Sequence, residues 1–396
     1  MKIIVIPMYS DEIVLKIGEK LNLQPSDVKR SIERKIISMD EYKGNKYIIF
    51  KKKVKHIERG TVLFLDSGDY IVGYPKIRRA LTLYPTLKKY FIDKIVIEEK
   101  LDGYNVRIGK INNNVIAITR GGRICPFTTK KVFNLLDTAI LDDYPDLVLC
   151  GEMIGYNNPY VSKYYPEVSH IYSDDNNIVE NLGFYIFDIR NKYTNEPFTI
   201  DEKLKMLKKY NLPHLEPLDI VDKSDVDRVK EIINSLNEEG REGIVLKDPY
   251  MAVEPIKYTT HHTQCNDLKV GFRYMYDLGI DFMFSRIIRE GYQSYEFNEN
   301  EEKIDKRSYE IGKSIVKPMV ETIREVAEGK LITEDYEIYL DNEDDLNEFL
   351  IYLKKLHIPY IIKNKEYKGN VIYVKIGKVY YSTRDRIKSH LDGSLL

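Results

Sequence analysis

The stretch EEKLDGYN, residues 98–105, places a lysine between two glutamates and an Asp-Gly pair. The run before it, KIVIEEK, has the composition of a β-strand and ends at Lys100, and Asp102-Gly103 then turns the chain. Glycine in such a turn lets the main chain approach a ligand closely. Lys100 is therefore a candidate nucleophile, although a single turn of this kind also fits an ordinary surface strand with ion pairs.

The segment after the turn predicts a hairpin. The runs NVRIGKI and VIAITR flank three asparagines at 112–114. Counting seven residues either side of the middle asparagine sets Val106 opposite Arg120. The return strand would then bring Thr119 and Arg120 beside Arg107 and the lysine turn. Guanidinium groups match phosphate oxygens, so this hairpin suits a phosphate-bearing ligand.

The charge state of Lys100 sets a requirement on its surroundings. A free lysine has a pKa of ~10.4, so few amines are nucleophilic at neutral pH. Lowering that pKa by two or three units takes ~3–4 kcal/mol, and a cation at ~4 Å in a surface-like dielectric supplies ~4 kcal/mol. Neighbouring carboxylates act the other way unless a metal ion or ligand donors occupy them. We therefore expect further cations near Lys100, together with acids that hold Mg²⁺.

Later β-type segments supply such groups. LVLCGEMIG carries Glu152, and GFYIFDIR presents Phe187, an aromatic ring that can stack on a base. REGIVLKDP carries Glu242 and Lys247, and PIKYTT carries Lys257. Carboxylate oxygens suit Mg²⁺, which fills its shell with water and substrate phosphates.

The spacing of Glu242 and Lys247 raises a geometric condition. Five residues separate them, so in a regular strand their side chains would face opposite sides. Both reach one site only if Gly243 lies in a bend or bulge.

Composition limits the class of protein. The 396 residues carry 61 Lys+Arg and 62 Asp+Glu, a net charge of -1, which excludes a chain-wide basic field. A nucleic acid would need a local positive cleft. Three cysteines cannot build a disulfide framework, which favours a cytoplasmic location. The start, MKIIVIPMYSDE, predicts a strand rather than a signal peptide, and no stretch approaches the ~18 apolar residues of a membrane helix.

Periodicity predicts an α+β protein in four parts. Residues 1–65 mix short strands with an amphipathic helix over PSDVKRSIERKI, and the lysines at 51–53 are expected on the solvated face of a strand, with RNA contact as the alternative. Residues 66–257 are strand-rich, and residues 258–330 become helical. Residues 331–396 read as strand (DYEIYL), helix (EDDLNEFLIYLKKLH) and strands (PYIIKNK, VIYVKIGKVYYST), a small α+β domain.

The ordered motifs resemble those of the covalent nucleotidyltransferases, which include ATP-dependent DNA ligases, RNA ligases and mRNA capping enzymes. The resemblance rests on Lys100-Leu101-Asp102-Gly103, Glu152, Phe187-Asp188, Glu242-Gly243 through Lys247, and Lys257. The fifth residue after the lysine is Asn105, where DNA ligases and capping enzymes carry arginine and RNA ligases carry asparagine. Arg120, twenty residues after the lysine, also resembles RNA ligases. GYPKIRRALTLYP and DLGIDFMFSRIIREGY are similar to archaeal ATP-dependent RNA ligases.

That resemblance implies an antiparallel-sheet, ATP-grasp-like adenylation core over 66–257, an N-terminal α/β domain, a helical dimerisation region and a small C-terminal domain. It implies a homodimer that uses ATP and Mg²⁺, with Mn²⁺ as a substitute. The reaction would join the 5′-phosphate and 3′-hydroxyl ends of single-stranded RNA, including circularisation, through lysyl-AMP and RNA-adenylate.

The resemblance also implies roles for residues. Lys100 would be the nucleophile, with Lys247 and Lys257 as further catalytic lysines; Lys269 competes with Lys257, which we favour. The nucleotide would contact Glu98, Leu101, Asn105, Arg107, Arg120, Glu152, Phe187 and Glu242. Of these, Glu152 and Glu242 would also serve the metal. RNA contacts are expected at Thr119, Arg120, Tyr160, Phe282, Arg286 and Glu290.

Two other functions remain open. One is a DNA ligase or a GTP-using capping enzyme, although the helical region followed by an α+β tail does not resemble the five-stranded OB barrel of those enzymes. The other is a non-catalytic nucleotide sensor or RNA-binding protein that keeps the fold.

Overall fold

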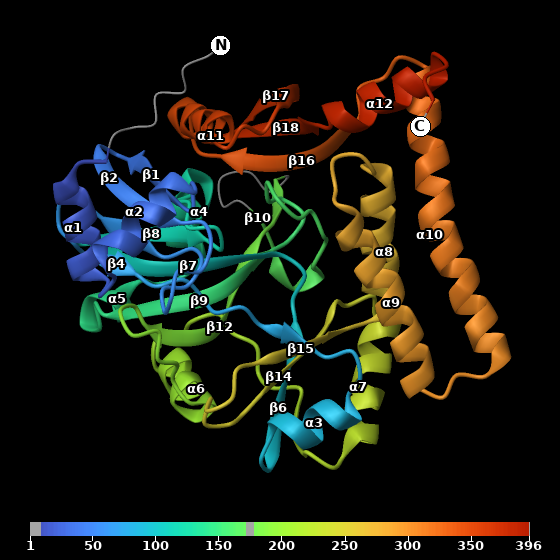
Figure 1. Ribbon diagram of the computed structural model, residues 1–396, viewed down its shortest axis with the longest axis horizontal. Helices are drawn as coiled ribbons and strands as arrows, with labels where there is room; N and C mark the ends of the chain where they lie inside the picture. Colours follow the sequence, from blue (N-terminus) through green and yellow to red (C-terminus); the bar gives the residue numbers. More distant parts are fainter. Residues whose placement is uncertain (1–8, 172–177, 396) are drawn as a thin grey trace. The chain divides into compact units, whose positions relative to one another are not determined.

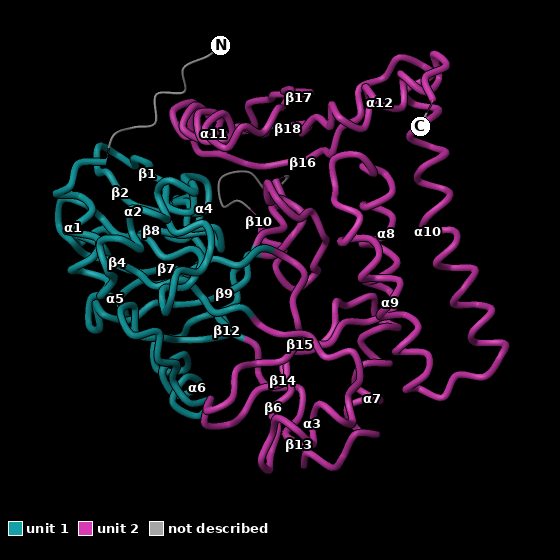
Figure 2. Tube along the Cα trace, in the orientation of Figure 1, with its two compact units in different colours: residues 1–76, 104–153, 183–214 teal, residues 77–103, 154–182, 215–396 magenta. Residues whose placement is uncertain are grey.

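The computed structural model describes residues 9–171 and 178–395, and the predicted strand in KIIVIP lies outside them. The chain divides into two compact units, each built from separate stretches of sequence (Figure 2). Unit 1 comprises residues 1–76, 104–153 and 183–214, and unit 2 comprises residues 77–103, 154–182 and 215–396.

The N-terminal part of unit 1 packs two helices on a four-stranded antiparallel sheet of order β1-β2-β3-β4 (Figure 1). Its elements are α1 (Asp11–Lys20), α2 (Pro25–Glu33), β1 (Ile37–Tyr42), β2 (Asn45–Phe50), β3 (Val62–Phe64) and β4 (Tyr70–Ile71). Buried aliphatic residues of both layers, among them Ile17, Val28 and Ile48, form the core. The predicted strand over the lysines at 51–53 is wrong, because β2 ends at Phe50 and these exposed lysines follow it.

The second sheet of unit 1 has the order β12-β9-β7-β8. Its strands are β7 (Tyr104–Ile111), β8 (Asn114–Thr119), β9 (Leu147–Ile154) and β12 (Gly183–Asn191), and the connecting helices are α4 (Pro126–Leu135), α5 (Ala139–Asp143) and α6 (Ile200–Lys209). A capping box between Thr199 and Glu202 fixes the start of α6.

The predicted hairpin is confirmed, but its register is wrong by one residue. Asn112 and Asn113 both have positive φ, 48° and 62°, so two residues rather than one make the turn. Val106 therefore pairs with Thr119 and not with Arg120.

Unit 2 contains a five-stranded sheet of order β13-β6-β14-β15-β5. The strands are β5 (Arg78–Arg79), β6 (Lys94–Lys100), β13 (Asp219–Asp222), β14 (Gly243–Lys247) and β15 (Ile256–Thr259). The helices α3 (Tyr84–Tyr90) and α7 (Val226–Glu238) contribute residues to the same hydrophobic core. One face is aliphatic: Ile95, Ile97, Ile244, Leu246 and Ile256 pack with residues of both helices. Each such buried side chain stabilises the fold by roughly 1.5–3 kcal/mol.

The predicted helical region is confirmed as α8 (His261–Arg273), α9 (Ile280–Glu296) and α10 (Glu301–Ala327). Figure 1 shows α8, α9 and α10 as long neighbouring helices. Of the described residues between 154 and 182, Pro166–Val168 form a 3-10 turn, and β10 (Ser169–Ile171) pairs with β11 (Val179–Asn181) in a small ladder. No helix of the described residues is long and apolar enough to cross a membrane.

The C-terminal part of unit 2 is a three-stranded sheet of order β16-β18-β17 with helices. Its elements are β16 (Thr333–Leu340), α11 (Glu343–Lys355), β17 (Tyr360–Lys368), β18 (Val371–Val379) and α12 (Tyr381–Leu391). The predicted strand through Thr383 is wrong after Val379. Tyr380 stacks on Tyr274 with ring centroids 3.8 Å apart, and α12 begins there. The α+β class with antiparallel sheets is confirmed.

Candidate active site

The face of the five-stranded sheet opposite its aliphatic core carries polar groups, and we call it the ionic face. Residues paired across neighbouring strands point to the same side, as do residues two apart in one strand. Val245 of β14 pairs with Glu98 on one side and with Lys257 on the other. Lys100 lies two residues after Glu98 in β6, and Lys247 lies two residues after Val245 in β14. The register therefore brings Glu98, Lys100, Lys247 and Lys257 to one face.

Two ion pairs join these residues. The Lys100 Nζ donates to Glu242 Oε2 at 2.5 Å, and the Lys247 Nζ lies 2.6 Å from Glu98 Oε2. The Lys247 and Glu98 side chains are only 2% and 4% exposed, so solvent screens their attraction weakly.

Gly243 explains how Glu242 reaches Lys100. Its φ of 146° lies in a region that side-chain-bearing residues rarely adopt, and a Cβ there would be 2.2 Å from the Tyr258 carbonyl oxygen. The strand alternation is therefore interrupted before β14 begins. Gly243 pairs in register with both neighbouring strands rather than lying in a bulge, and Glu242 precedes β14, yet Glu242 and Lys247 both contact residues of the ionic face.

Burial raises the pKa of the Glu242 carboxyl, while the charge of Lys100 acts to lower it. Asp102 and Asp267 add to the increase. A carboxylate in this position is stabilised by a nearby cation. The contact with Lys100 provides that cation in the absence of a ligand.

The turn after Lys100 is held by a loop that sequence reasoning did not single out. The Asp102 N–H donates to Tyr165 Oη at 2.8 Å, and the Lys163 Nζ lies 3.4 Å from Asp102 Oδ2. Tyr165 is fully buried and Leu101 is buried as well. We singled out Tyr160 in this aromatic loop; nothing in its composition marks Tyr165 as the contact.

The two competing lysines differ in position. Lys257 lies within β15, opposite Val245. Lys269 is an exposed residue of α8 whose Nζ donates to Asn266 Oδ1 at 3.2 Å. Lys257 therefore shares the ionic face with Lys100, and Lys269 has a local helix contact.

Unit 1 holds the remaining motif residues. Asn105 of β7 pairs with Glu152 of β9, so the two side chains point to one side of that sheet. Among the described residues, Asn105 Oδ1 is buried without a hydrogen-bond partner. Phe187 of β12 is partly exposed and meets the Tyr74 ring edge-on, with centroids 5.4 Å apart. The unsatisfied Asn105 oxygen is expected to have a ligand or a water molecule as its partner.

The Arg107 side chain is buried and binds main-chain carbonyl groups. Its guanidinium donates to the carbonyls of Val72 and Gly60 at 2.7 Å each, and to Thr119 O at 3.3 Å. The side chain is 1% exposed. The expectation that Arg107 contacts a nucleotide is corrected, because its donors hold main-chain carbonyls together.

Three predicted RNA contacts lie in loops or strand ends. Thr119 Oγ1 donates to Arg123 O at 3.1 Å in a tight turn that also contains the partly exposed Arg120. The Tyr160 side chain of unit 2 lines an apolar pocket together with aromatic residues that include Tyr336 and Phe349.

The other three lie on α9. Arg286 covers the Phe282 ring at 3.5 Å from its centroid and pairs with Asp267 at 2.8 Å. Glu290 is 2% exposed and pairs with both His261 and Arg307. The expectation that Glu290 contacts RNA is therefore corrected, because its carboxylate is buried among cations.

Family comparison defines the class of the protein. Residues 93–259 match the family described as RNA ligase, and residues 270–394 match the family described as the ligase Pab1020 C-terminal region. The fold and these matches make the protein an enzyme of the RNA-ligase class.

Whole-chain relatives narrow the class. A structure described as an archaeal ATP-dependent RNA ligase is 38% identical, with a TM-score of 0.89 over 97% of this chain and 99% of that chain. An uncharacterised protein of Methanocaldococcus jannaschii is 54% identical over 96% of each chain. A protein of Aquifex aeolicus assigned as an ATP-dependent DNA ligase is 30% identical, with a TM-score of 0.85 over 94% of this chain and 100% of that chain. The chain belongs to the family of archaeal ATP-dependent RNA ligases.

Proposed function

We propose that this enzyme uses ATP to join the 5′-phosphate and 3′-hydroxyl ends of single-stranded RNA, including the two ends of one molecule. The observation that supports this most is the ionic face, where Lys100 shares one side of the sheet with Lys247 and Lys257. A lysine nucleophile among other cations is the arrangement that phosphoryl transfer requires, because positioning and electrostatics supply most of its catalysis.

Three steps follow. The Lys100 Nζ attacks the α-phosphorus of ATP, so that a P–N bond forms, the bond to the β-phosphate oxygen breaks and pyrophosphate leaves. An oxygen of the RNA 5′-phosphate then attacks the same phosphorus, and the amine leaves with a proton. Finally the RNA 3′-hydroxyl attacks the activated 5′-phosphate, loses its proton, and AMP departs as the phosphodiester forms.

The ion pair with Glu242 has to open before the first step, because an ammonium group has no lone pair for attack. We infer that Glu242, with Glu152, would hold Mg²⁺ or Mn²⁺. The Glu242 carboxylate, which contacts Lys100, is a hard oxygen donor that fits such a cation, because Mg²⁺ takes one or two carboxylates and leaves the rest of its shell to water and phosphate. When bound, the cation neutralises phosphate charge. Lys247 and Lys257 would bind the phosphates.

The nucleotide and RNA contacts are proposals of the same kind. The Glu98 carboxylate, which pairs with Lys247, would accept from the adenine amine. Phe187 would stack on adenine, and Asn105 and Arg120 would bind ribose or phosphate. RNA would contact Thr119, Arg120, Tyr160, Phe282 and Arg286. The four domains predicted from the sequence, with their three boundaries, stay part of this proposal.

The experiment is mass spectrometry of the protein incubated with ATP and Mg²⁺. The mass should increase by one AMP in the wild type and not in Lys100→Ala, and GTP should give no adduct. A 5′-phosphorylated single-stranded RNA should then circularise. An unmodified wild type would overturn the proposal.

A DNA substrate is the second candidate, because the Aquifex aeolicus relative is assigned as a DNA ligase. Joining of nicked DNA and of RNA, compared at equal enzyme concentration, separates the two. Faster sealing of nicked DNA than of RNA would identify DNA as the substrate in place of RNA.

We also propose a homodimer through α9 and α10. Both helices expose apolar side chains at helical spacing, namely Ile280, Phe284, Ile287 and Tyr295 on α9 and Tyr309, Val316, Val320 and Ile323 on α10. Such a surface marks an interaction site. Light scattering should give a dimer for the wild type and for Leu15→Asp, an exposed apolar control on α1, and a monomer for Phe284→Asp. A monomeric wild type would contradict it. We also infer a cytoplasmic location, because three cysteines cannot build a disulfide framework.

A further inference from the structure

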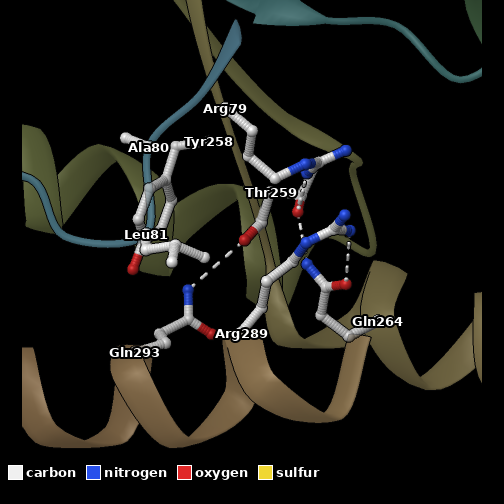
Figure 3. A pocket seen from close by; sticks show the side chains of 8 residues that line it. All are labelled: Arg79, Ala80, Leu81, Tyr258, Thr259, Gln264, Arg289 and Gln293. Carbon is white, nitrogen blue, oxygen red and sulfur yellow. Dashed lines mark hydrogen bonds between the residues drawn. The ribbon is translucent and has the colours of Figure 1, made fainter. Parts of the chain in front are cut away.

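A small pocket lies beside the ionic face, entirely within unit 2. It is lined by β5, β15, α8 and α9 through Arg79, Ala80, Leu81, Tyr258, Thr259, Gln264, Arg289 and Gln293 (Figure 3). The guanidinium groups of Arg79 and Arg289 lie on the same side of this pocket, next to Thr259 and Gln264.

The two guanidiniums have few partners. Arg79 donates to Thr259 Oγ1 at 2.5 Å, and Arg289 donates to Gln264 Oε1 at 3.3 Å and to Ser285 Oγ at 3.5 Å. Within residues 9–171 and 178–395 neither forms an ion pair with a carboxylate. Each guanidinium has five N–H donors, so most of them remain available.

The charges around the pocket leave an excess of cations. Asp267 acts on both guanidiniums, and it pairs with Arg286 at 2.8 Å. Glu242 also acts on Arg79, but it is paired with Lys100. Burial and the neighbouring charges of Arg79 and Arg286 lower the pKa of Arg289 to about 10, and burial also lowers the pKa of Arg79. Like charges gathered in this way are stabilised by a bound anion.

The strand register connects the pocket to Lys100. Gly243 pairs with Lys100 on one side and with Thr259 on the other, so the three residues form one row across β6, β14 and β15. The middle residue has no side chain. Thr259 Oγ1 accepts hydrogen bonds from Arg79 and from Gln264, which leaves its own hydroxyl hydrogen for a further acceptor.

We propose that Arg79, Arg289 and the Thr259 hydroxyl bind a phosphate group of the substrate one strand away from Gly243. This inference rests on the proposed function, and it adds a binding site to the lysines of the ionic face. Guanidinium forks match phosphate oxygens bidentately, and two of them with a hydroxyl donor suit a group that carries more than one charge. The phosphate belongs either to the β,γ end of ATP or to the 5′ end of RNA.

The test compares Arg79→Gln and Arg289→Gln with Arg228→Gln. Arg228 is a matched control in the same unit, because it pairs with Asp219 and Glu231 and lies outside the pocket. Three quantities are measured on the full chain: affinity for inorganic pyrophosphate, the KM for ATP in AMP–protein formation, and the KM for 5′-phosphorylated RNA in transfer of AMP from preformed adduct.

Each pocket variant should weaken binding of one substrate, either ATP with pyrophosphate or 5′-phosphorylated RNA, about tenfold, the usual effect of a lost charged hydrogen bond. If ATP supplies the phosphate, the ATP KM and pyrophosphate affinity change and the RNA KM does not. If RNA supplies it, only the RNA KM changes, and binding of 5′-hydroxyl RNA stays as in the wild type. Arg79→Lys should recover part of the loss, and this separates a charge effect from misfolding.

The proposal is overturned if both pocket variants match the wild type in all three measurements while Lys100→Ala forms no adduct. If the wild type forms no AMP adduct, the proposed function itself is overturned. Binding of pyrophosphate and of 5′-phosphorylated RNA would then decide the pocket alone, and equal affinities in wild type and variants would reject it.

Discussion

Lys100 and Glu242 form an ion pair of 2.5 Å although Glu242 precedes β14 and is not the strand residue opposite Lys100. Lys100 pairs in register with Gly243, and Glu242 is the residue before it. The contact depends on the backbone of Gly243, whose φ of 146° turns the preceding carboxylate back toward the lysine.

Gly243→Ala should destabilise the protein and slow AMP–protein formation more than tenfold. The new Cβ would lie 2.2 Å from the Tyr258 carbonyl oxygen, and strain of this kind costs roughly 1–3 kcal/mol. Thermal melting and the adenylation rate measure both effects. Gly312→Ala in α10 is the control, because nothing lies within 4 Å of its Cβ, and it should be neutral or stabilising by up to ~1 kcal/mol. Equal melting temperatures for both variants would argue against the strained backbone.

Tyr165→Phe should lower the rate of adenylation about tenfold while leaving the KM for ATP close to that of the wild type. The substitution leaves the Asp102 N–H without its acceptor at 2.8 Å, which costs about 1–3 kcal/mol and loosens the turn after Lys100. Tyr165 acts as a positioning residue. Tyr164→Phe alters its neighbour, which is 62% exposed, and should behave as wild type. A change in KM alone would point to a different role.

Lys257→Ala should reduce adenylation by ~10²–10³-fold, the effect of removing one preorganised electrostatic group. Lys269→Ala should leave the rate unchanged, because Lys269 is exposed on α8 and contacts Asn266. Rapid-quench measurement of AMP–protein formation compares the two variants. A larger loss of adenylation rate in Lys269→Ala than in Lys257→Ala would identify Lys269 as the lysine of the last motif.

Stability should depend on pH through His261. Burial acts to lower its pKa, but hydrogen bonds to Cys265 and Glu290 raise it, and the result is about 10. A raised pKa means that the stabilisation is fully present below the unfolded value of ~6.5 and is lost as pH rises toward about 10, at ~1.4 kcal/mol per unit.

Urea unfolding at several pH values between 6 and 10 tests this with His261→Gln. The wild type should exceed the variant by the largest margin at the acidic end, and the margin should shrink as pH rises. His357→Asn, at an exposed position with positive φ, is the control. A margin independent of pH would exclude His261 as the titrating group.

Local sequence predicted β6, β7, β8, β9, β12, β14 and β15, because alternation and turn residues are local signals, but the short strands β5 and β13 were not predicted. KIVIEEK is β6, which ends at Lys100, and the asparagine turn is present. The hairpin register failed by one residue, since composition does not say whether one or two asparagines form the turn. The contacts of Tyr165, Arg79 and Arg289 depend on loop and helix packing, which no spacing in the sequence encodes. The burial of Arg107 and Glu290 was missed for the same reason.

The two faces of β6 have a consequence for how the enzyme can change in evolution. Ile95 and Ile97 alternate with Val96, Glu98 and Lys100, and the ladder with β14 keeps the two sets apart. One inserted or deleted residue in this strand would send the carboxylate and amine inward and the aliphatic groups outward. Such an indel would abolish folding and chemistry together, so we expect length variation in the connections and only point substitutions within the strand.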